Sequence, residues 1–326
     1  MQQAALRSRN GDIQLGTIVV PTPKAGQVLL QVMAAAINPV DYKLPYMVAG
    51  KHVGIDVAGI VTASSSSIFK VGDEVFGFAA EGSLAEYAVA NEEKIASKPK
   101  SISWIQAAAL PVAYATSYQA LTTHGNLKAG QRVLILGASG GTGTAGLLIA
   151  AALQATSIVA VCSAANKELV LSLGATSVVD YTDTDAYEAF KNSSDKFDLV
   201  YDCASSSGKQ EWYLDDARKY FLKPGGKVIA INGGALQWLR AFTGLQSKDF
   251  NLILTKQSGA DLTALLELLS KNNKNDFAPI IDSTFSLTSE GVVLGFERQK
   301  SRRARGKIVY TIGCDASKDS TDKNAK

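Results

Sequence analysis

The most constraining feature of this 326-residue sequence is a strand, a glycine-rich turn and a helix in direct succession. The apolar run 133–136 leads into Gly137-Ala138-Ser139-Gly140-Gly141-Thr142-Gly143, and an apolar, helix-forming stretch follows over 145–153. Glycines in such a turn let the backbone approach a pyrophosphate closely, and the free N–H groups of the next helix attract its charge. The succession therefore predicts a dinucleotide-binding site, with a tight helix-packing turn as the alternative.

The sequence after this turn alternates between helix-like and strand-like segments. Helix-sized stretches separate four further strands, expected at 158–162, 178–181, 199–203 and 228–231. Such βαβ repetition is typical of a doubly wound parallel sheet, a Rossmann domain. One more helix is expected at 262–269, and strand-like texture returns at 279–285 and 307–311.

The sequence before about residue 110 has a different pattern. Short β-branched runs at 17–20, 28–32, 57–62, 73–78 and 86–89 are interrupted by Gly, Pro and Ser. That pattern predicts a small, irregular β domain. We therefore expect an α/β protein of two domains, in keeping with the length of the chain.

The residues after the second strand of the parallel sheet indicate which dinucleotide is bound. An NAD enzyme ordinarily carries an acid there, which holds the ribose hydroxyls. This chain has none and offers instead Ser163, Asn166 and Lys167, whose hydroxyl, amide and ammonium groups suit a 2′-phosphate. NADPH is therefore favoured over NADH, while an interpretation of Lys167 as a solvated helix residue stays open.

The composition argues against several other functions. The three cysteines are far apart, and with only two histidines the chain lacks the clustered ligands of a zinc site, so no metal is expected. The formal net charge of +3 is spread along the chain, which disfavours nucleic-acid binding. Neither a signal peptide nor an apolar run of membrane-spanning length is evident, so we expect a cytoplasmic protein.

Several short motifs occur in a specific order. They are Asn38-Pro39-Val40-Asp41-Tyr42-Lys43, Gly54-Ile55-Asp56-Val57-Ala58-Gly59, Val71-Gly72-Asp73-Glu74-Val75, Leu84-Ala85-Glu86-Tyr87, Ala107-Ala108-Ala109-Leu110-Pro111, the glycine turn, Leu173-Gly174-Ala175 and Gly306-Lys307-Ile308-Val309. From about residue 27 to 312 the chain resembles the quinone oxidoreductase branch of the zinc-free medium-chain dehydrogenases/reductases, especially its chloroplast-envelope-type homologues.

The resemblance implies a GroES-like β-rich catalytic domain, built from both chain ends, with a Rossmann domain inserted between them. The expected boundaries are 1–113 and 275–313 for the catalytic domain, 114–274 for the NADPH-binding domain and 314–326 for a disordered tail. Zinc-dependent relatives carry Gly-His-Glu where this chain has Gly54-Ile55-Asp56, so the ligand histidine is absent.

The resemblance also implies a set of cofactor-binding residues. In similar enzymes the lysine that matches Lys43 reaches the cofactor phosphates or the nicotinamide edge, and the tyrosine that matches Tyr181 borders the 2′-phosphate. The full expected set is Lys43, Thr116, Ser139, Gly140, Gly141, Thr142, Ser163, Asn166, Lys167, Tyr181, Ala204, Ile231, Gly233, Gly306 and Lys307.

Two departures from the family pattern bear on the substrate pocket. Only residues 44–53 separate Lys43 from Gly54, a stretch that is usually longer. In addition, Tyr114 stands where relatives often carry a small residue. We therefore expect Tyr46 and Tyr114 to line a reshaped substrate pocket.

The implied activity is NADPH-dependent, metal-free reduction of a small-molecule substrate, a quinone or another α,β-unsaturated carbonyl compound. Hydride goes to an electron-poor carbon while negative charge gathers on the carbonyl oxygen, and that oxygen needs a hydrogen-bond donor. The candidate donors are Asn38, Tyr42, Lys43 and Tyr46. Each tyrosine is about equally well explained as a packing residue.

Other functions and assemblies stay open. An NADPH-binding sensor, or a crystallin-like protein that contacts RNA with little turnover, would keep the same cofactor pocket. A hydrolase is disfavoured, because Ser139 lacks the Gly-x-Ser-x-Gly pattern, and because Asp41 and Asp56 are expected in structural turn hydrogen bonds. The number of subunits is not fixed by the sequence, and a homodimer is one expected assembly.

Overall fold

The computed structural model describes residues 1–204, 217–272 and 277–314, which form two compact units. The first unit comprises Met1–Ala115, Gln257–Leu266 and Asn275–Lys326, and the second comprises Thr116–Lys256 and Glu267–Lys274. The expected boundaries put residues 257–266 in the NADPH-binding domain, whereas the structure assigns them to the first unit. A Cβ added at Gly259 would lie only 2.1 Å from the carbonyl oxygen of Ile95. This segment therefore packs tightly within the first unit. Residues 315–326 of the expected tail lie outside the described residues.

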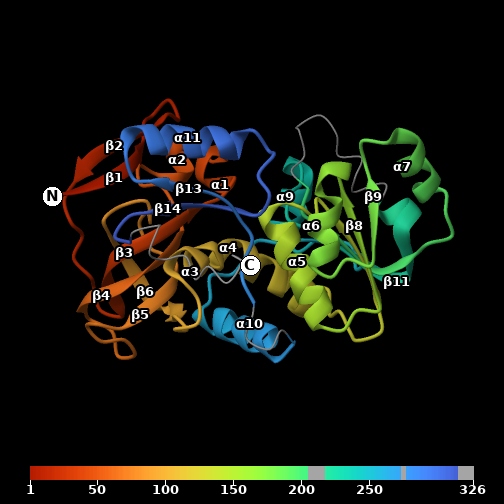
Figure 1. Ribbon diagram of the computed structural model, residues 1–326, viewed down its shortest axis with the longest axis horizontal. Helices are drawn as coiled ribbons and strands as arrows, with labels where there is room; N and C mark the ends of the chain where they lie inside the picture. Colours follow the sequence, from red (N-terminus) through yellow and green to blue (C-terminus); the bar gives the residue numbers. More distant parts are fainter. Residues whose placement is uncertain (205–216, 273–276, 315–326) are drawn as a thin grey trace, which may run out of the picture. The chain divides into compact units, whose positions relative to one another are not determined.

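The first unit is built around a six-stranded sheet (Figure 1). In spatial order its strands are β13 (Ile281–Ser286), β14 (Lys307–Thr311), β3 (Gln27–Ile37), β4 (Asp56–Ser64), β5 (Glu74–Ala79) and β6 (Tyr87–Ser97). Because β3 also pairs with β6, the strands β3 to β6 close on themselves as in a small barrel. Strand β14, from the C-terminal part of the chain, pairs with β3, so both ends of the chain build this sheet.

Two further strands and several helices complete the first unit. The strands β1 (Gln2–Arg7) and β2 (Ile13–Ile18) form a separate antiparallel pair. The helices are α1 (Val40–Lys43), α2 (Tyr46–Ala49), α3 (Trp104–Ala109) and α11 (Ser289–Lys300), while α4 (Pro111–Tyr118) and α10 (Gly259–Asn272) continue into the second unit. The predicted β-rich domain is confirmed, except that the first predicted run ends at Ile18 rather than at Val20.

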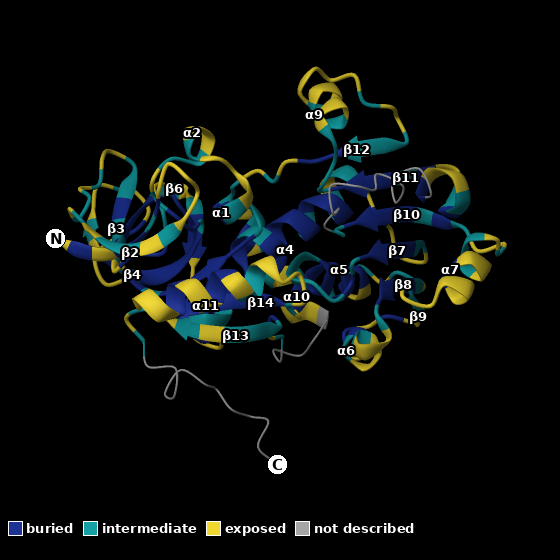
Figure 2. Cartoon of the chain, turned by 90° about the horizontal axis from the view of Figure 1, so that it is seen from above, coloured by how far each residue is buried: buried dark blue, intermediate teal, exposed yellow. Residues whose placement is uncertain are grey.

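The second unit has an all-parallel sheet, which confirms the predicted Rossmann domain. In spatial order its strands are β12 (Phe250–Leu252), β11 (Leu222–Ala230), β10 (Phe197–Asp202), β7 (Arg132–Leu136), β8 (Ser157–Cys162) and β9 (Ser177–Asp180). Its helices are η1 (Gln119–His124), α5 (Gly141–Ala152), η2 (Ala164–Asn166), α6 (Lys167–Ser172), α7 (Thr184–Lys191), η3 (Ala217–Phe221) and α9 (Ala235–Phe242). Figure 2 shows the central strands β7, β8 and β10 largely buried.

The strand order of the parallel sheet determines where a ligand can bind. The chain runs from β7 outwards to β8 and β9, and β10 then returns to the other side of β7. In open parallel sheets, ligands bind at the carboxyl ends of the strands beside such a switch point. The glycine turn follows β7 at this edge, so the fold puts the predicted dinucleotide site at the switch point.

Candidate functional site

The glycine turn 137–143 joins β7 to α5 at the carboxyl edge of the parallel sheet. Gly137 has a φ of +74°, a left-handed conformation that glycine adopts without strain. A Cβ at Gly137 would lie 2.9 Å from the Cα of Ala204, and a Cβ at Gly143 would lie 2.2 Å from the carbonyl oxygen of Gly137. Both glycines are therefore needed for the turn to pack against the end of β10 and against its own helix.

Gly140 has a different role, because the space beside it is open. It is the N-cap of α5, with a φ of −76° and no side-chain capping bond. Among the described residues, a Cβ at Gly140 would meet the carbonyl oxygen of Gly137 at the ordinary contact distance of 3.6 Å and nothing nearer. The first turn of α5 carries no acid, and the first N–H groups of a helix lack intrahelical partners. This open, electropositive helix end fits a pyrophosphate.

The hydroxyl of Ser117 links α4 to this turn, a contact that the sequence analysis missed. Ser117 donates to the carbonyl oxygen of Thr142 at 2.8 Å, and its oxygen lies 3.1 Å from the hydroxyl oxygen of the buried Tyr201. The neighbouring Thr116, a predicted cofactor residue, is buried, with its hydroxyl oxygen 2.5 Å from that of Thr255. The buried Ser117 hydroxyl therefore holds the turn at Thr142.

Three of the predicted cofactor residues form one hydrogen-bonded group. The side-chain amide of Asn166 donates to the hydroxyl of Ser139 at 3.0 Å and to the hydroxyl of Ser163 at 3.2 Å. Asn166 thus connects the glycine turn to the segment that follows β8. Lys167 is exposed at the start of α6, directly beside this group in the chain.

One acidic residue at the same edge escaped the sequence analysis. Asp180 ends β9 and is paired in register with Cys162 of β8. Its Oδ1 accepts hydrogen bonds from the backbone and the hydroxyl of Thr182 at 2.9 and 2.7 Å, and these bonds lower the pKa of Asp180. The predicted Tyr181 follows it and is exposed. In the sequence, Asp180 could have been found as the acid at the end of β9, one strand later than the position of the usual ribose-binding acid.

The predicted backbone contacts on the other side of the glycine turn lie at the ends of β10 and β11. The N–H of Ala204 donates to the carboxylate of Asp202 at 3.0 Å, and its carbonyl oxygen accepts from the amide of Asn232 at 2.9 Å. The N–H of Ile231 donates to the carbonyl oxygen of Asp202 at 3.2 Å. Gly233 follows two residues later. These bonds tie the two strand ends together beside the turn.

In the first unit, a buried polar cluster of four residues contains two of the predicted site residues, Asn38 and Lys307. The ammonium group of Lys307 donates to Oδ1 of Asn38 at 2.5 Å and to Oδ2 of Asp56 at 2.9 Å. The Asn38 amide donates to the same Asp56 oxygen at 3.0 Å, and the Asn38 N–H donates to Asp41 at 2.7 Å. All four residues are at most 5% exposed. The cluster therefore links β14 to β4 and to the segment that precedes α1.

This cluster corrects the expected place of Asp56 and gives Asn38 and Lys307 a structural role in addition to the predicted one. Asp56 does not lie in a turn, since it begins β4, and its second carboxylate oxygen accepts from the N–H of Val112 at 2.9 Å. Asn38 and Lys307 have a structural role that sequence analysis missed, because the partners are 269 residues apart. Their contact with substrate or cofactor stays a prediction. Gly306, with a φ of +88°, fixes the entry into β14.

The other predicted hydrogen-bond donors follow Asn38 on two short helices. Tyr42 is half-buried against the core of the first unit, and Tyr46, at the start of α2, is also half-buried. The Lys43 side chain is exposed. Although the residue is exposed overall, partial desolvation of its ammonium group and the positive charge of Arg302 lower the pKa of Lys43. A lowered pKa makes this ammonium group a better proton donor at neutral pH than an ordinary lysine.

Tyr114, predicted to line the substrate pocket, is fully buried. Its ring packs edge-on against that of Phe277, with 5.6 Å between the ring centroids, and both residues belong to the first unit. Such a contact stabilises the packing of this unit. A role of Tyr114 in substrate size selection stays a prediction.

Asp41 should make the stability of the protein depend on pH. Burial, opposed by the hydrogen bond from Asn38, raises the pKa of Asp41 from 3.8 to about 7. A carboxyl with a raised pKa stays protonated in the folded protein at a pH where the unfolded chain has already released its proton. The wild type therefore loses stability as the pH rises from the unfolded pKa to the folded pKa, and Asn at this position does not titrate. We therefore expect Asp41→Asn to gain stability relative to wild type, by a few kcal/mol, between about pH 4 and pH 7.

Urea unfolding of both proteins at several pH values would measure this change. The same substitution at the exposed Asp12 serves as the control. A stability difference between Asp41→Asn and wild type that stays constant from pH 4 to pH 8 would contradict the expected role of Asp41.

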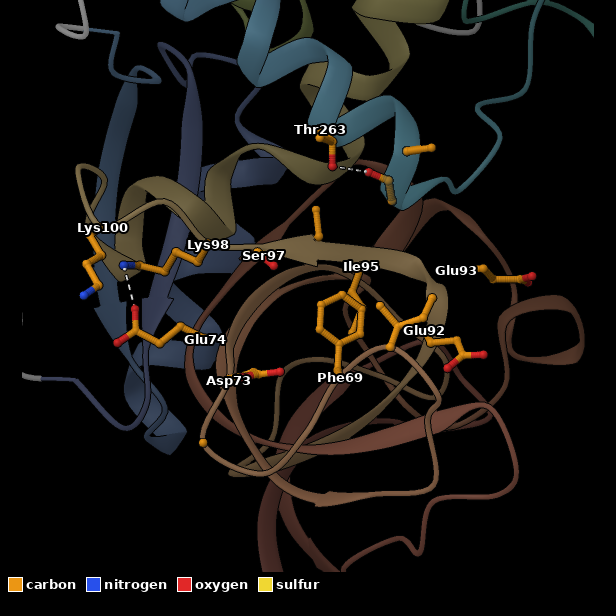
Figure 3. A pocket seen from close by; sticks show the side chains of 15 residues that line it. Phe69, Asp73, Glu74, Glu92, Glu93, Ile95, Ser97, Lys98, Lys100 and Thr263 are labelled. Carbon is orange, nitrogen blue, oxygen red and sulfur yellow. Dashed lines mark hydrogen bonds and ion pairs between the residues drawn. The ribbon is translucent and has the colours of Figure 1, made fainter.

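A hollow of about 810 Å³ in the first unit is separate from these groups (Figure 3). It lies beside β5, β6 and the start of α10 and has a charged lining. Glu74 pairs there with Lys98 at 3.2 Å, and hydrogen bonds from Ser66 and Ser67 lower the pKa of Glu92. None of the predicted site residues lines this hollow.

The described residues offer neither a metal-ligand cluster nor a membrane-spanning helix. They contain no group of three or more His, Cys, Asp or Glu side chains that could hold a metal ion. Nor does the part of the chain that the structure describes include a helix with the length and apolar character needed to cross a membrane.

Comparison with known families agrees with both units. The family described as alcohol dehydrogenase GroES-like domain matches residues 24–100, and the family described as zinc-binding dehydrogenase matches residues 173–309. Among solved structures, an alcohol dehydrogenase superfamily protein from Novosphingobium aromaticivorans superposes with a TM-score of 0.77. It is 28% identical, and the match covers 95% of this chain and 99% of that one.

Curated relatives identify the branch of the family. The NADPH-dependent alkenal/one oxidoreductase of Arabidopsis thaliana, a chloroplastic protein, is 32% identical over 90% of this chain and 74% of its own length. A chloroplastic quinone-oxidoreductase homologue of Spinacia oleracea is 37% identical over 67% of this chain and 69% of its own length. The chain therefore belongs to the medium-chain dehydrogenase/reductase family, in its quinone oxidoreductase branch.

Proposed function

We propose that this protein reduces conjugated carbonyl compounds, enones, alkenals or quinones, with NADPH as the reductant. The observation that carries the proposal is the open glycine turn at Gly140, which is hydrogen-bonded through Ser139 and Asn166 to residues 163–167, a segment without an acid. The names of the relatives support the same chemistry, since they describe an NADPH-dependent alkenal/one oxidoreductase and a quinone oxidoreductase homologue.

The residues of the second unit fit NADPH. When bound, this cofactor supplies a hydride for an electron-poor carbon of the substrate. The N–H groups at the start of α5 would hold the pyrophosphate, and Ser163, Asn166 and Lys167 would hold the 2′-phosphate. Asp180 is an acidic residue at this edge, but its Oδ1 is engaged by Thr182. We therefore assign the 2′-phosphate preference to Lys167.

Lys167→Ala should weaken NADPH much more than NADH. A lost charge-assisted contact to the 2′-phosphate is expected to raise the Michaelis constant for NADPH roughly 10- to 100-fold and to leave that for NADH nearly unchanged. Lys128→Ala removes the same charge from an exposed position before β7, at the opposite edge of the sheet, and serves as the control. An equal effect of Lys167→Ala on both cofactors would remove this residue from the 2′-phosphate site.

The residues of the first unit would act on the substrate side. Tyr46 and Lys43 are the accessible candidates for a hydrogen bond to the carbonyl oxygen, on which negative charge gathers. Tyr42 is a third candidate. Asn38 would act as a positioning residue, because both ends of its amide are engaged with Lys307 and Asp56. A protonated donor at this point would stabilise the enolate or hydroquinone anion.

Activity should survive removal of metal ions. We infer that the protein uses no metal, because the expected ligand histidine is replaced by Ile55 and the chain has only two histidines. Dialysis against a strong chelator should leave NADPH oxidation within about twofold of its starting rate. Stoichiometric zinc that is lost together with turnover, and restored with it, would overturn this inference.

The direct test of the proposed function is an assay across substrates. NADPH consumption is followed at the nicotinamide absorbance band with quinones, alkenals and vinyl ketones. We expect turnover with at least one of these classes. Tight NADPH binding without turnover on any of them would instead support an NADPH-binding sensor.

Location and assembly remain predictions of the sequence. We propose a cytoplasmic location, although the two relatives described above are named as chloroplastic. We also keep a homodimer as the expected assembly. Size-exclusion chromatography with light scattering would measure the number of subunits.

A further inference from the structure

The helix α9 has an unusual environment for a segment of its composition. It is built from Ala-Leu-Gln-Trp-Leu-Arg-Ala-Phe, yet none of its residues is buried. Six of these eight residues are apolar, and large apolar side chains on a helix normally pack against other parts of the protein or against lipid. In Figure 2, α9 and the turn that follows it are coloured as intermediate or exposed.

The two faces of α9 differ in what they contact. Trp238 and Ala241 pack on a small cluster formed by Ala230 and Leu252, so this face rests on the parallel sheet. Four large apolar residues on α9 and in the turn after it are exposed instead, namely Leu236 (56%), Leu239 (60%), Phe242 (72%) and Leu245 (73%). We call these four residues the α9 face. Exposed apolar side chains gathered on one short segment mark an interaction surface.

The charges along the chain before and after α9 are mostly positive, up to Asp249, which follows the basic stretch. Residues 217–248 contain six lysines and arginines and no aspartate or glutamate. Within this stretch Arg218 and Lys223 are paired with Asp249 and Asp198. Arg240, in the last turn of α9, and Lys248, after the turn, are exposed. The apolar face is therefore flanked by two exposed cations.

We propose that the α9 face docks the protein on the surface of an anionic lipid bilayer. Apolar side chains next to exposed basic residues are the composition of helices that lie in a membrane interface, with an aromatic ring at the headgroup boundary. The ring of Phe242 stacks on that of Trp238, with 5.7 Å between the centroids, which gives the face such an aromatic border. The cations would interact with anionic headgroups while the leucines enter the acyl boundary.

A second copy of this chain fits the face less well. A two-fold symmetric contact places the same patch on both sides, so it would bring Arg240 and Lys248 of both copies into one contact. An anionic bilayer has the complementary charge. Docking there would bring the carboxyl edge of the sheet, which ends in Ile231 and Gly233 shortly before α9, close to lipid. Apolar enones and quinones partition into lipid, so docking would bring the site close to its substrates. This benefit of docking rests on the proposed function.

Vesicle binding of the full chain tests the proposal. We expect co-sedimentation with vesicles of phosphatidylcholine and phosphatidylglycerol, weaker binding at high salt, and little binding to phosphatidylcholine alone. The double variant Leu239→Gln/Phe242→Gln should lose about 10- to 100-fold in partitioning, since two apolar side chains leave the lipid. Arg240→Glu should lose about tenfold through the headgroup attraction. Ile68→Gln/Val71→Gln, which changes two equally exposed apolar residues in the first unit, should bind as wild type does.

The outcomes separate this proposal from the proposed function. NADPH oxidation with a water-soluble alkenal is measured on the same variants without vesicles, so binding and turnover can fail independently. Absence of vesicle binding by the wild type, or equal binding by wild type, the double variant and Arg240→Glu, would overturn the proposal. A wild-type dimer that the double variant converts to monomer would also overturn it, because the face would then be a protein interface.

Discussion

Replacing Lys307 with methionine should destabilise the protein by about 3–5 kcal/mol, because it leaves the carboxylate of Asp56 buried without its cation. Asp56 is fully buried and Lys307 is 4% exposed, so water cannot replace the lost partner. The ammonium group also donates to Ile37 and Asn38, and these acceptors would lose a donor as well. The free energy of unfolding in urea measures the effect.

An exposed ion pair provides the matched control for this substitution. Arg218 and Asp249 are 2.9 Å apart, but their side chains are 46% and 39% exposed. Arg218→Ala should therefore cost about 1 kcal/mol or less. Changing both buried partners, in Lys307→Met/Asp56→Asn, should cost less than the sum of the two single changes. A Lys307→Met protein as stable as wild type, but defective in NADPH binding, would instead make Lys307 a cofactor contact.

Alanine at Gly143 should destabilise the fold and alanine at Gly140 should not, although the two residues lie three positions apart in one turn. At Gly143 the new Cβ would collide with backbone, 2.2 Å from the oxygen of Gly137 and 2.6 Å from the Cα of Ala138. Backbone cannot move aside as a side chain can, so Gly143→Ala should lose about 1–3 kcal/mol of stability. Cofactor binding should fall with it.

Gly140→Ala tests the cofactor site without this damage to the fold. Its Cβ would lie 3.6 Å from the nearest described atom, and a φ of −76° suits alanine, so stability should stay within about 0.5 kcal/mol of wild type. The added methyl group would occupy the space predicted for the pyrophosphate, and NADPH affinity should fall roughly 10- to 100-fold. Urea unfolding of both variants measures the difference in stability, and isothermal titration of Gly140→Ala and wild type with NADPH measures the loss of affinity. Wild-type affinity of Gly140→Ala would exclude close approach of a phosphate at this turn.

The cofactor half of the site could be predicted because its signals are local. Gly137 to Lys167 form one continuous stretch from the end of β7 through α5 and β8 to the start of α6, so the order of residues along the chain nearly determines which side chains meet. The contact of Asn166 with Ser139 follows from that order. Asp180 was missed because it reaches this edge on a third strand, one step beyond the segment that the motif describes.

The substrate half could be predicted only in part, because its contacts join distant residues. Asn38, Asp56 and Lys307 come from three strand ends, and no spacing in the sequence shows that a lysine 251 residues after Asp56 neutralises it. Burial was also hard to foresee. Tyr114 was expected at a pocket, and its ring is enclosed against Phe277, a packing partner 163 positions later in the chain.

Transfer of deuterium from the nicotinamide ring to the product tests the central claim most directly. The protein is supplied with NADPH that is deuterated at C4 on each face in turn, together with an alkenal or vinyl ketone, and the product is analysed by mass spectrometry. The account predicts one deuterium atom at the electron-poor β-carbon, delivered from one face only, and much slower turnover with NADH. Product without deuterium from either labelled cofactor, or no product from any conjugated carbonyl compound, would contradict it.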